Sequence, residues 1–417
     1  MAQLTPDALA FDGPLLAIEE AVAMLRARLG PIADTETVSP MAAAGRVLAV
    51  DVVAPRPLPP FDNSAVDGHA VRIGDVAPEG LTRLSVVDRV AAGAAATTTI
   101  GPGEAARVFT GAPLPPGTDT VYMQEDTVAG DGTVDVPAGL KRGANARFAG
   151  EDLAVGAVAL AAGRLLRPQD IGLLAALGIG RVAVRRRPRV ALVSTGDEVI
   201  EPGEPLPPAG IHDANRAMLA ALVAASGAEV VDHGIVRDDR AALSARLARM
   251  GESHDLILTS GGVSTGEEDH VKAAVEAVGR LDLWRVAIKP GRPVALGVVG
   301  GAVFCGLPGN PVAAFVTHAR IVRPLLAILA GEHWVGPRVW PVVAGFSYRK
   351  KEGRREYVRV SLADLPDGRR LASKHAQDGA GVITSLTATD GLVELAEPVT
   401  RVQEGDVVPF LGWDGLV

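Results

Sequence analysis

The sequence predicts a multidomain protein that combines a doubly wound, mostly parallel α/β domain with β-rich domains. Three observations support this fold class. The chain has 417 residues, which is too long for one typical hydrophobic core. Strand-like and helix-like segments alternate between residues 189 and 331. Short β-branched runs, separated by Gly, Pro and Asp, lie on both sides of that stretch.

The N-terminal part of the chain is predicted to be helical. Apolar residues recur with helical spacing from Gly13 to Leu29, and Gly30-Pro31 is a stop signal. A second helix is predicted from Met41 to Val50. The proline-rich residues 55–60 that follow are typical of a linker.

Residues 51–143 have the pattern of a compact β domain, because short β-branched runs alternate there with turn-forming residues. A new helix is predicted to begin near Arg167-Pro168 and to end at Gly178. We therefore expect the β domain to be inserted into a helical domain that is assembled from two segments, residues 13–50 and 144–184.

Residues 185–333 are expected to form the α/β domain. The predicted strands are residues 189–194, 228–231, 255–260 and 302–307, with a further strand after residue 293. The predicted helices are residues 215–226, 239–250 and 269–278, and a helix that begins at Pro311. This alternation indicates a mostly parallel sheet with helices on both faces.

After Gly336 the pattern returns to short strands. Turns such as Asp367-Gly368 and Asp390-Gly391 separate these strands, and both pair a turn-forming acid with a glycine. Residues 334–417 are therefore expected to form a small terminal β domain.

Composition excludes several classes of protein. The formal net charge of -8 argues against a nucleic-acid-binding protein, because such proteins collect Lys and Arg to neutralise phosphates. The amino terminus lacks a basic start before an apolar core, and no run of about eighteen apolar residues is apparent, so we expect no membrane contact. The single cysteine, Cys305, lies in an apolar run, which is typical of a buried thiol in the reducing cytoplasm.

Four loops are expected at the carboxyl ends of the predicted strands, where open parallel sheets bind ligands. Helix amino termini, which favour anions, meet the chain at the same edge. The loops contain, in chain order, Ser194, Thr195, Gly196, Asp197 and Glu198; Asp238 and Asp239; Ser260, Gly261, Gly262, Ser264, Glu267 and Asp269; and Pro308, Gly309, Asn310 and Pro311.

The residue types in these loops suit a phosphorylated ligand and a hard cation. The glycines allow backbone N–H groups to approach a phosphate, and the carboxylates can hold a cation. A structural interpretation stays open for each loop, since Ser264 with Glu267 would form a capping box and Pro311 would begin a helix. The convergence of all four loops on one edge favours a binding site.

Other turns carry polar residues whose role the local sequence leaves open. Residues 289–293 form a rigid turn that presents Lys289 and Arg292, either to an oxyanion or simply to solvent. The turns at residues 61–68, 109–113 and 150–152 can be purely structural. The eight histidines form no metal-binding motif, and neither a nucleophile elbow nor a Walker A loop is present, which weakens zinc-enzyme, hydrolase and ATPase interpretations.

These loops together resemble those of the MoeA and gephyrin E family, and the likeness extends across nearly the whole chain. The family's segments occur here in the family's order. They are FDNSAVDG, TGAPLPPGTD, GED, STGDE, SGGVSTGEED, KPGRP and LPGNPVAA.

The resemblance implies four domains: a helical domain from two segments, an inserted β domain, a molybdopterin-binding α/β domain and a C-terminal β barrel. It also implies an elongated homodimer in which the inserted domain of one subunit faces the α/β site of the other. That arrangement would give Asp62, Thr110 and Asp152 a role in the partner's site.

The implied activity is the insertion of molybdenum from molybdate into adenylylated molybdopterin, with Mg²⁺-dependent release of AMP. Glu198 and Asp269 would position the metal or water, Asp238 the pterin or metal, and Lys289 the oxyanion. The expected cofactor-binding residues are Ser194, Thr195, Gly196, Asp197, Ser260, Gly261, Gly262, Ser264, Lys289, Arg292, Pro308, Gly309, Asn310 and Pro311.

Two alternative functions stay open. One is a molybdopterin adenylyltransferase, which would use a similar α/β domain without the inserted and terminal β domains; such an enzyme and other cofactor-biosynthesis proteins are also possible partners. The other is a non-catalytic scaffold of the gephyrin kind, which could have lost the site loops.

Two positions depart from the family's usual pattern. His69 stands where the family usually has Tyr, and Tyr122 replaces a usual small aliphatic residue. Neither is a proposed ligand, so the departures concern the packing of the inserted domain.

Overall fold

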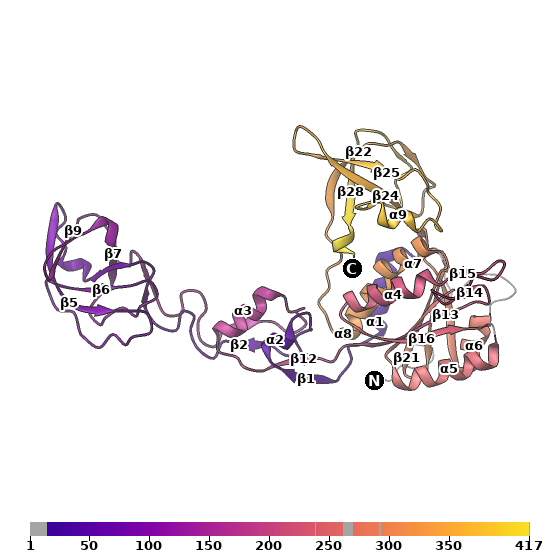
Figure 1. The fold of residues 1–417 in the computed structure, drawn as a ribbon, viewed down its shortest axis with the longest axis horizontal. Coiled ribbons are helices and arrows are strands. Elements are labelled where there is room, and N and C mark those ends of the chain that lie inside the picture. The colour runs from indigo at the N-terminus through magenta and orange to yellow at the C-terminus, as the bar shows by residue number, and fades with distance from the viewer. Residues whose placement is uncertain (1–14, 238, 262–269, 292, 417) are drawn as a thin grey trace.

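The computed structural model describes residues 15–237, 239–261, 270–291 and 293–416. Figure 1 shows an elongated molecule with a β-rich unit at one end and a slender linking unit in the middle. An α/β unit and a second β-rich unit lie together at the other end. The predicted multidomain α/β and β architecture is confirmed.

The α/β unit is built on a mixed sheet whose strands lie in the order β16-β13-β17-β21-β20-β18. The first four are mutually parallel, as predicted, and β20 runs antiparallel to both of its neighbours. The bounds are β13 (Arg189–Thr195), β16 (Glu229–Val236), β17 (Leu256–Ser260), β18 (Gly279–Arg285), β20 (Pro293–Val299) and β21 (Ala302–Leu307). Sequence patterns did not predict β18.

Helices cover both faces of this sheet, as expected for a doubly wound fold. The bounds are α4 (Ala214–Ala225), α5 (Arg240–Ser253) and α6 (His270–Val278). Because successive strand residues point to opposite faces, Leu192 of β13 packs in the core that includes α4. Its neighbour Val193 packs in the core that includes α5 and α6.

The helix that begins at Pro311 is longer than the usual helix of such a domain. It consists of α7 (Pro311–Thr317), a π-helical turn η4 (His318–Val322) and α8 (Arg323–Ala330). By length and composition alone, residues 311–330 could cross a membrane, which the sequence analysis did not anticipate. However, 83% of the most apolar window is buried inside the structure, as in the core helix of a folded domain.

The N-terminal helix α1 (Ile18–Arg28) packs against the α/β unit. Its buried residues Ala21 and Leu25 belong to the same core as α8 and the sheet. The sequence grouped this segment with the helical domain because its apolar spacing shows that it packs, but not what it packs against.

The linking unit is made of short elements from two chain segments. Strand β1 (Thr35–Val38) pairs with β12 (Val182–Arg185), and β2 (Val52–Val53) pairs with β11 (Val158–Leu160). The helices are α2 (Pro40–Ala43) and α3 (Pro168–Ala176). The predicted helix from Met41 to Val50 is therefore wrong beyond Ala43, because Gly45 adopts a φ of 70° and ends it.

The inserted unit contains a sheet in the order β7-β4-β6-β5-β9-β8, with apolar clusters on both faces. The strands are β4 (Gly68–Val71), β5 (Leu81–Val90), β6 (Glu104–Val108), β7 (Thr120–Met123), β8 (Val128–Ala129) and β9 (Thr133–Pro137). A separate pair, β3 (Asn63–Ser64) with β10 (Ala146–Arg147), lies where the chain enters and leaves the unit. Two short 3-10 turns are η2 (Ile73–Asp75) and η3 (Gln124–Asp126).

The C-terminal unit is a closed β barrel, as predicted. Its strands pair in the cyclic order β24-β25-β22-β28-β26, and β26 returns to β24. The bounds are β22 (Trp340–Ala344), β24 (Arg355–Asp364), β25 (Arg370–Lys374), β26 (Gly391–Leu395) and β28 (Val407–Gly412). Smaller elements are β23 (Tyr348–Arg349), β27 (Arg401–Val402), α9 (Thr384–Thr387) and η5 (Trp413–Gly415).

The barrel is attached to the α/β unit by backbone pairing as well as by the chain itself. The short strand β19 (Ile288–Lys289) of the α/β unit adds parallel to β24 of the barrel. This pairing carries Lys289 to the boundary between the two units.

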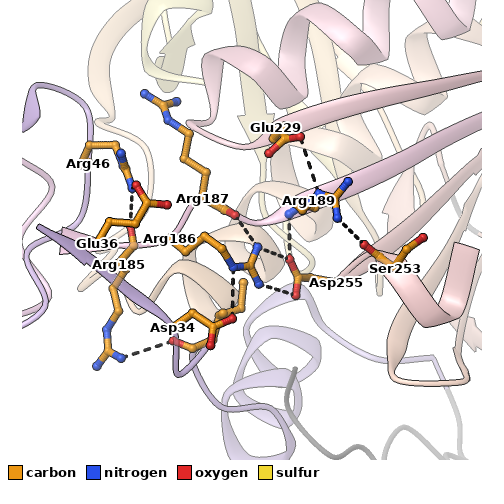
Figure 2. Close-up of polar contacts among 11 residues, drawn as sticks. Asp34, Glu36, Arg46, Arg185, Arg186, Arg187, Arg189, Glu229, Ser253 and Asp255 are labelled. Carbon is orange, nitrogen blue, oxygen red and sulfur yellow. Dashed lines mark hydrogen bonds and ion pairs between the residues drawn. The ribbon is translucent and has the colours of Figure 1, made fainter. Parts of the chain in front are cut away.

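The joint between the linking unit and the α/β unit is held by an arginine network, which Figure 2 shows. Arg186 donates two hydrogen bonds of 3.0 Å to the buried carboxylate of Asp255. Its Nε also donates to Asp34, at 3.2 Å, which precedes β1. The chain passes between the two units twice, once before β1 near Asp34 and once after β12 at Arg186. Through these bonds, Arg186 connects both passages to Asp255 at the start of β17.

Candidate active site at the carboxyl ends of the parallel strands

A cavity of about 250 Å³ lies at the carboxyl ends of β13, β17 and β21. Three of the four predicted loops contribute to it, so the structure brings them together as expected. The predicted residues that line it are Ser194, Thr195, Glu198, Ser260, Gly261, Gly309 and Pro311. The remaining lining residues are Val199, Ile211, His212, Asp213, Ala214, Asn215 and Gly381.

Glycines allow these loops to lie close together. Gly261 has a φ of 90°, and a Cβ there would lie 3.1 Å from the carbonyl oxygen of Thr195. Gly196 has a φ of 130°, and a Cβ there would lie 2.6 Å from the carboxylate of Glu198. A larger residue at 261 would therefore push apart the loops that follow β13 and β17, and one at 196 would displace the Glu198 side chain within its own loop.

Asn215, on the first turn of α4, ties three of the lining segments together. Its amide donates hydrogen bonds of 2.9 Å to the Ser260 hydroxyl and of 2.8 Å to the Gly309 carbonyl. Sequence reasoning placed Asn215 at a helix start without assigning it to the site. The position after a strand-end loop was the only local signal, and the two contacts depend on residues distant in sequence.

Two hydroxyl groups that line the cavity have no hydrogen-bond partner among the described residues. They belong to Ser194, which is 1% exposed, and to Thr195, which is 5% exposed. Leaving a buried polar group unpaired costs roughly 1–3 kcal/mol. These hydroxyls are therefore suited to bind polar atoms of a ligand.

The cavity is lined by two carboxylates that differ in their partners. Asp213 caps α4 by accepting from the Arg216 backbone N–H at 3.0 Å, and it also accepts from the Arg216 Nε at 3.0 Å. Burial opposes the charge of Arg216, but hydrogen bonds to Glu201, Asp232 and Asp213 outweigh it and raise the pKa of Arg216. Among the described residues, no ion pair or hydrogen bond engages the carboxylate of Glu198.

A second pair of loops is also in contact at this edge. The guanidinium of Arg237, which follows β16, donates a 2.6 Å hydrogen bond to the backbone carbonyl of Asp197. The pair β14 (Val199–Ile200) and β15 (Ile211–His212) continues from Glu198 and borders the cavity. The loop after β16 thus reaches the loop after β13.

Part of the predicted site cannot be compared with the structure. Gly262, Ser264, Asp238, Asp269 and Arg292 lie outside the described residues. Within the described ranges, no group of three or more His, Cys, Asp or Glu side chains is arranged to hold a metal ion. Glu198 alone could contribute one carboxylate ligand there.

A second cavity, of about 310 Å³, lies between the α/β unit and the barrel. The loop of residues 308–311 separates the two cavities, because Gly309 and Pro311 line the first whereas Pro308 and Asn310 line the second. Lys289 also lines the second cavity. The barrel contributes Tyr348, Glu356, Tyr357, Val358, Arg359, Asp378 and Ala380.

The barrel holds Lys289 in place. Its ammonium lies 3.0 Å from the carboxylate of Glu356, which is 1% exposed. Tyr348 donates a 2.9 Å hydrogen bond to the same Glu356 oxygen. Burial, followed by the bond to Glu356, raises the pKa of Tyr348 and keeps its phenol protonated.

Arg359 is a cation of this cavity that sequence reasoning missed. It is buried, and its guanidinium donates to the backbone carbonyls of Gln377 at 2.9 Å and Gly379 at 3.3 Å. Its Nε has no partner among the described residues, and burial lowers the pKa of this arginine. No local motif marks Arg359, since it is one residue of an ordinary barrel strand.

Asp62 precedes β3, Thr110 follows β6 and Asp152 follows β10. None of the three lines either cavity of the same chain. Asp62 accepts a 2.8 Å hydrogen bond from the backbone N–H of Ala149. Thr110 donates to Asp67 from its hydroxyl, at 2.7 Å, and from its backbone N–H, at 2.8 Å. A single chain therefore does not bring these residues to the predicted site.

The expected inert cysteine is found. Cys305 is fully buried in β21, and burial raises the pKa of its thiol to about 12. A thiol with that pKa carries almost no thiolate near neutral pH.

Comparisons with known proteins cover almost the whole chain. The family model described as "MoeA N-terminal region (domain I and II)" matches residues 16–178. The model "Probable molybdopterin binding domain" matches residues 191–328, and "MoeA C-terminal region (domain IV)" matches residues 341–413.

Full-length relatives give the same result. A molybdopterin molybdenumtransferase from Haemophilus influenzae is 37% identical, over 97% of this chain and 100% of that protein. One from a Nostoc species is also 37% identical, over 91% of this chain and 88% of that protein. The crystal structure of a molybdopterin biosynthesis MoeA protein from Pyrococcus horikoshii matches with a TM-score of 0.83 and 30% identity, over 96% of this chain and 100% of that chain.

Proposed function

The chain belongs to the MoeA family of molybdopterin molybdenumtransferases, and on this basis we propose that it inserts molybdenum into adenylylated molybdopterin with release of AMP. The reaction is a transferase step in molybdenum cofactor biosynthesis. The adenylyltransferase and scaffold alternatives are not favoured, because full-length relatives carry the transferase name.

The observation that carries this proposal is the cavity at the ends of β13, β17 and β21. Its glycines expose backbone, its Ser194 and Thr195 hydroxyls have no hydrogen-bond partner among the described residues, and two helices begin at its rim. The amino termini of α4 and α7 favour an anion there. These features suit the phosphate bridge of an adenylylated pterin.

The residues present also fit a magnesium ion. Proteins commonly bind Mg²⁺ through one or two carboxylates together with phosphate oxygens and water. The unpaired carboxylate of Glu198 would supply such a ligand, and the sequence adds Asp238 and Asp269 as candidates. When bound, the ion would offset the negative charge of the phosphate bridge.

We infer that molybdate enters through the second cavity. Lys289 and Arg359 supply positive charge there, and the loop of residues 308–311 lines both this cavity and the first. Glu356 holds the Lys289 ammonium at the cavity wall, so the cation is positioned before an anion arrives. In an acidic protein, such cations lower the repulsion between two anionic substrates.

We further propose that the enzyme works as a homodimer in the cytoplasm. Thr110 follows β6, and Glu198 lies between β13 and β14. Figure 1 shows β6 at one end of the molecule and β13 and β14 at the other, so a second subunit is needed to bring such residues to one site. The buried reduced Cys305 suits a reducing compartment.

Incubation of the purified protein with adenylylated molybdopterin, Mg²⁺ and molybdate tests the proposed activity. We expect AMP release and active cofactor, both dependent on molybdate. Free molybdopterin with MgATP is the comparison, since an adenylyltransferase would consume ATP. Absence of molybdate-dependent AMP release from folded, dimeric protein would reject the proposal.

A further inference from the structure

Two arginines face each other across neighbouring strands of the inserted unit. Arg89 of β5 is directly opposite Arg107 of β6. Both guanidinium groups lie over the ring of Phe109, with their central carbons 4.6 Å and 5.0 Å from the ring centre. Each interaction of this kind stabilises by roughly 0.5–1 kcal/mol at an exposed site and fixes the orientation of the cation.

Arg107 is further fixed by neutral acceptors. It donates to the Gly68 carbonyl at 3.2 Å and to the side-chain oxygen of Gln124. In the part of the chain that the structure describes, no ion pair joins Arg89 or Arg107 to a carboxylate. Two positive charges are thus held side by side without a direct ion pair to a carboxylate of the described residues.

Other arginines of the same unit behave differently. Arg83, also on β5, makes two 2.8 Å hydrogen bonds to Asp135. Arg142 lies 3.0 Å from Asp119. Like charges directly opposite each other on neighbouring strands are destabilising, so the Arg89–Arg107 pair costs stability unless an anion binds.

The arginine pair lies beside Thr110, which the family resemblance connects with the site of a partner subunit. Asp67, whose carboxylate interacts electrostatically with Arg107, accepts a hydrogen bond from the backbone N–H of Thr110 and one from its hydroxyl. The hydrogen bond from the Thr110 backbone N–H lowers the pKa of Asp67 most, and the bond from the Thr110 hydroxyl lowers it further. The charge of Arg107 has a smaller effect in the same direction. Asp67 therefore fixes the turn and leaves the guanidinium groups open.

We propose that Arg89 and Arg107 form a binding site for a tetrahedral oxyanion of the reaction, presented to the inserted unit by the partner subunit. The oxyanion is either the phosphate bridge of the adenylylated pterin or the incoming molybdate. This inference rests on the proposed function and on the proposed dimer. It assigns to the inserted unit the task of clamping an anionic substrate from the side opposite the α/β cavity.

The first test needs no turnover. The full-length protein is treated with phenylglyoxal, which modifies accessible guanidinium groups, and modification of each arginine is followed by peptide mass spectrometry. Inorganic phosphate and molybdate are added separately as probes. At a probe concentration about twice its dissociation constant, the pair should react about threefold more slowly, whereas Arg83 and Arg142 keep their rates. Equal effects at all four arginines, or none at any, would overturn the proposal.

The second test identifies the source of the oxyanion. Arg89→Gln and Arg107→Gln should each raise one KM about tenfold while kcat changes much less. A rise in KM for adenylylated molybdopterin assigns the pair to the phosphate bridge, and a rise in KM for molybdate assigns it to that ion. Arg83→Gln, on the same strand with the same loss of charge, should change neither. Unchanged KM values in both variants of the pair contradict the proposal.

The two tests separate this inference from the proposed function. If the wild-type protein released no AMP, the proposed function would fail, and phosphate protection of Arg89 and Arg107 would still decide whether the pair binds oxyanions. Arg107→Lys keeps the charge but loses the forked geometry, so it should restore part of the affinity lost in Arg107→Gln.

Discussion

At the residue scale, we expect ligand binding in the cavity to depend on hydroxyl groups that have no hydrogen-bond partner among the described residues. Thr195 is such a residue at the cavity wall, and Thr259 is an equally buried, equally unpaired threonine on β17 that does not line the cavity. Comparison of Thr195 with Thr259 therefore separates the effect of an unpaired hydroxyl that lines the cavity from the effect of one that does not.

Replacement of Thr195 by Val keeps the shape and removes the hydroxyl. Because that hydroxyl is unpaired, we expect the free energy of unfolding to stay constant or rise by about 1 kcal/mol. The KM for adenylylated molybdopterin should nevertheless rise about tenfold, since the ligand loses a hydrogen bond. Thr259→Val should show the same stability and an unchanged KM. Identical kinetics in the two variants would argue that the cavity does not bind the substrate.

His69 gives the inserted unit a pH-dependent stability. Burial, followed by the charge of Arg107, lowers its pKa from 6.5 to about 4. The unfolded chain therefore takes up a proton near pH 6.5, whereas the folded unit takes it up only near pH 4. Protection of β4 and β7 amides from hydrogen exchange should fall as pH drops across that window, and His69→Gln should flatten the fall. An unchanged slope in the variant would rule out His69 as the cause.

Local sequence predicted those site residues whose type suits a strand-end loop. Glu198, Ser260 and Gly309 belong to this group, because the ends of parallel strands and the loops that follow them meet at one edge of the sheet, where ligands bind. Asn215 and Arg359 escaped prediction for a physical reason. Their contacts join segments that are far apart in the chain, and each residue type is ordinary at its own position.

At the element scale, the two positions that the sequence analysis expects to depart from the family's usual pattern lie next to each other. His69 on β4 is directly opposite Tyr122 on β7 in an antiparallel pair, so both side chains point to the same face. Tyr122 is fully buried there, in the cluster with Leu84 and Val136. A smaller ring at position 69 thus accompanies a larger residue at position 122, which conserves volume.

A double-mutant cycle tests this compensation. His69→Tyr alone should overpack the face and cost about 2 kcal/mol, and Tyr122→Val alone should leave a cavity and cost about 3 kcal/mol. The double variant should cost at least about 1 kcal/mol less than the sum, because the new tyrosine fills the new space. Chemical unfolding followed by hydrogen exchange of the β4 and β7 amides measures this coupling. Strict additivity would show that the two positions are independent.

Sequence patterns predicted individual helices and strands, but they did not predict which elements pack against each other. Strand and helix alternation predicted β13, β16, β17 and β21 as strands of a mostly parallel sheet, because each strand-helix unit carries its own periodicity. Their order in the sheet was not predicted. The docking of α1 on the α/β core was not predictable, because amphipathic spacing does not name the partner. The helix expected from Met41 failed because a positive φ at Gly45 outweighs the helical propensity of its neighbours.

At the scale of the whole molecule, the orientation of the linking unit depends on the arginine joint of Figure 2. Asp255 is 6% exposed and accepts both hydrogen bonds of Arg186. Arg189 also takes part, but its charge partner Glu229 is exposed and lies 3.6 Å away. The two arginines thus differ in the burial of the carboxylate that they neutralise.

Arg186→Gln should destabilise the protein by about 3 kcal/mol, because it leaves the buried carboxylate of Asp255 without its cation. It should also widen the range of angles between the linking and α/β units, which small-angle X-ray scattering would detect as a change in the radius of gyration and in the distance distribution relative to the unsubstituted protein. Arg189→Gln is the matched control and should cost less than about 1 kcal/mol. Equal effects of the two substitutions would mean that the joint does not depend on Arg186.

Mixed dimers test whether each active site draws on two subunits. Thr110→Val disables the inserted unit, and Glu198→Gln disables the α/β cavity, so each homodimer should be inactive. In a heterodimer of the two variants, a shared site pairs the intact cavity of one chain with the intact inserted unit of the other. Random reassortment of equal amounts makes half the dimers mixed, and each holds one complete site, so about one quarter of wild-type activity should return. If each site belonged to a single chain, every chain would carry a defect, and mixing would restore nothing.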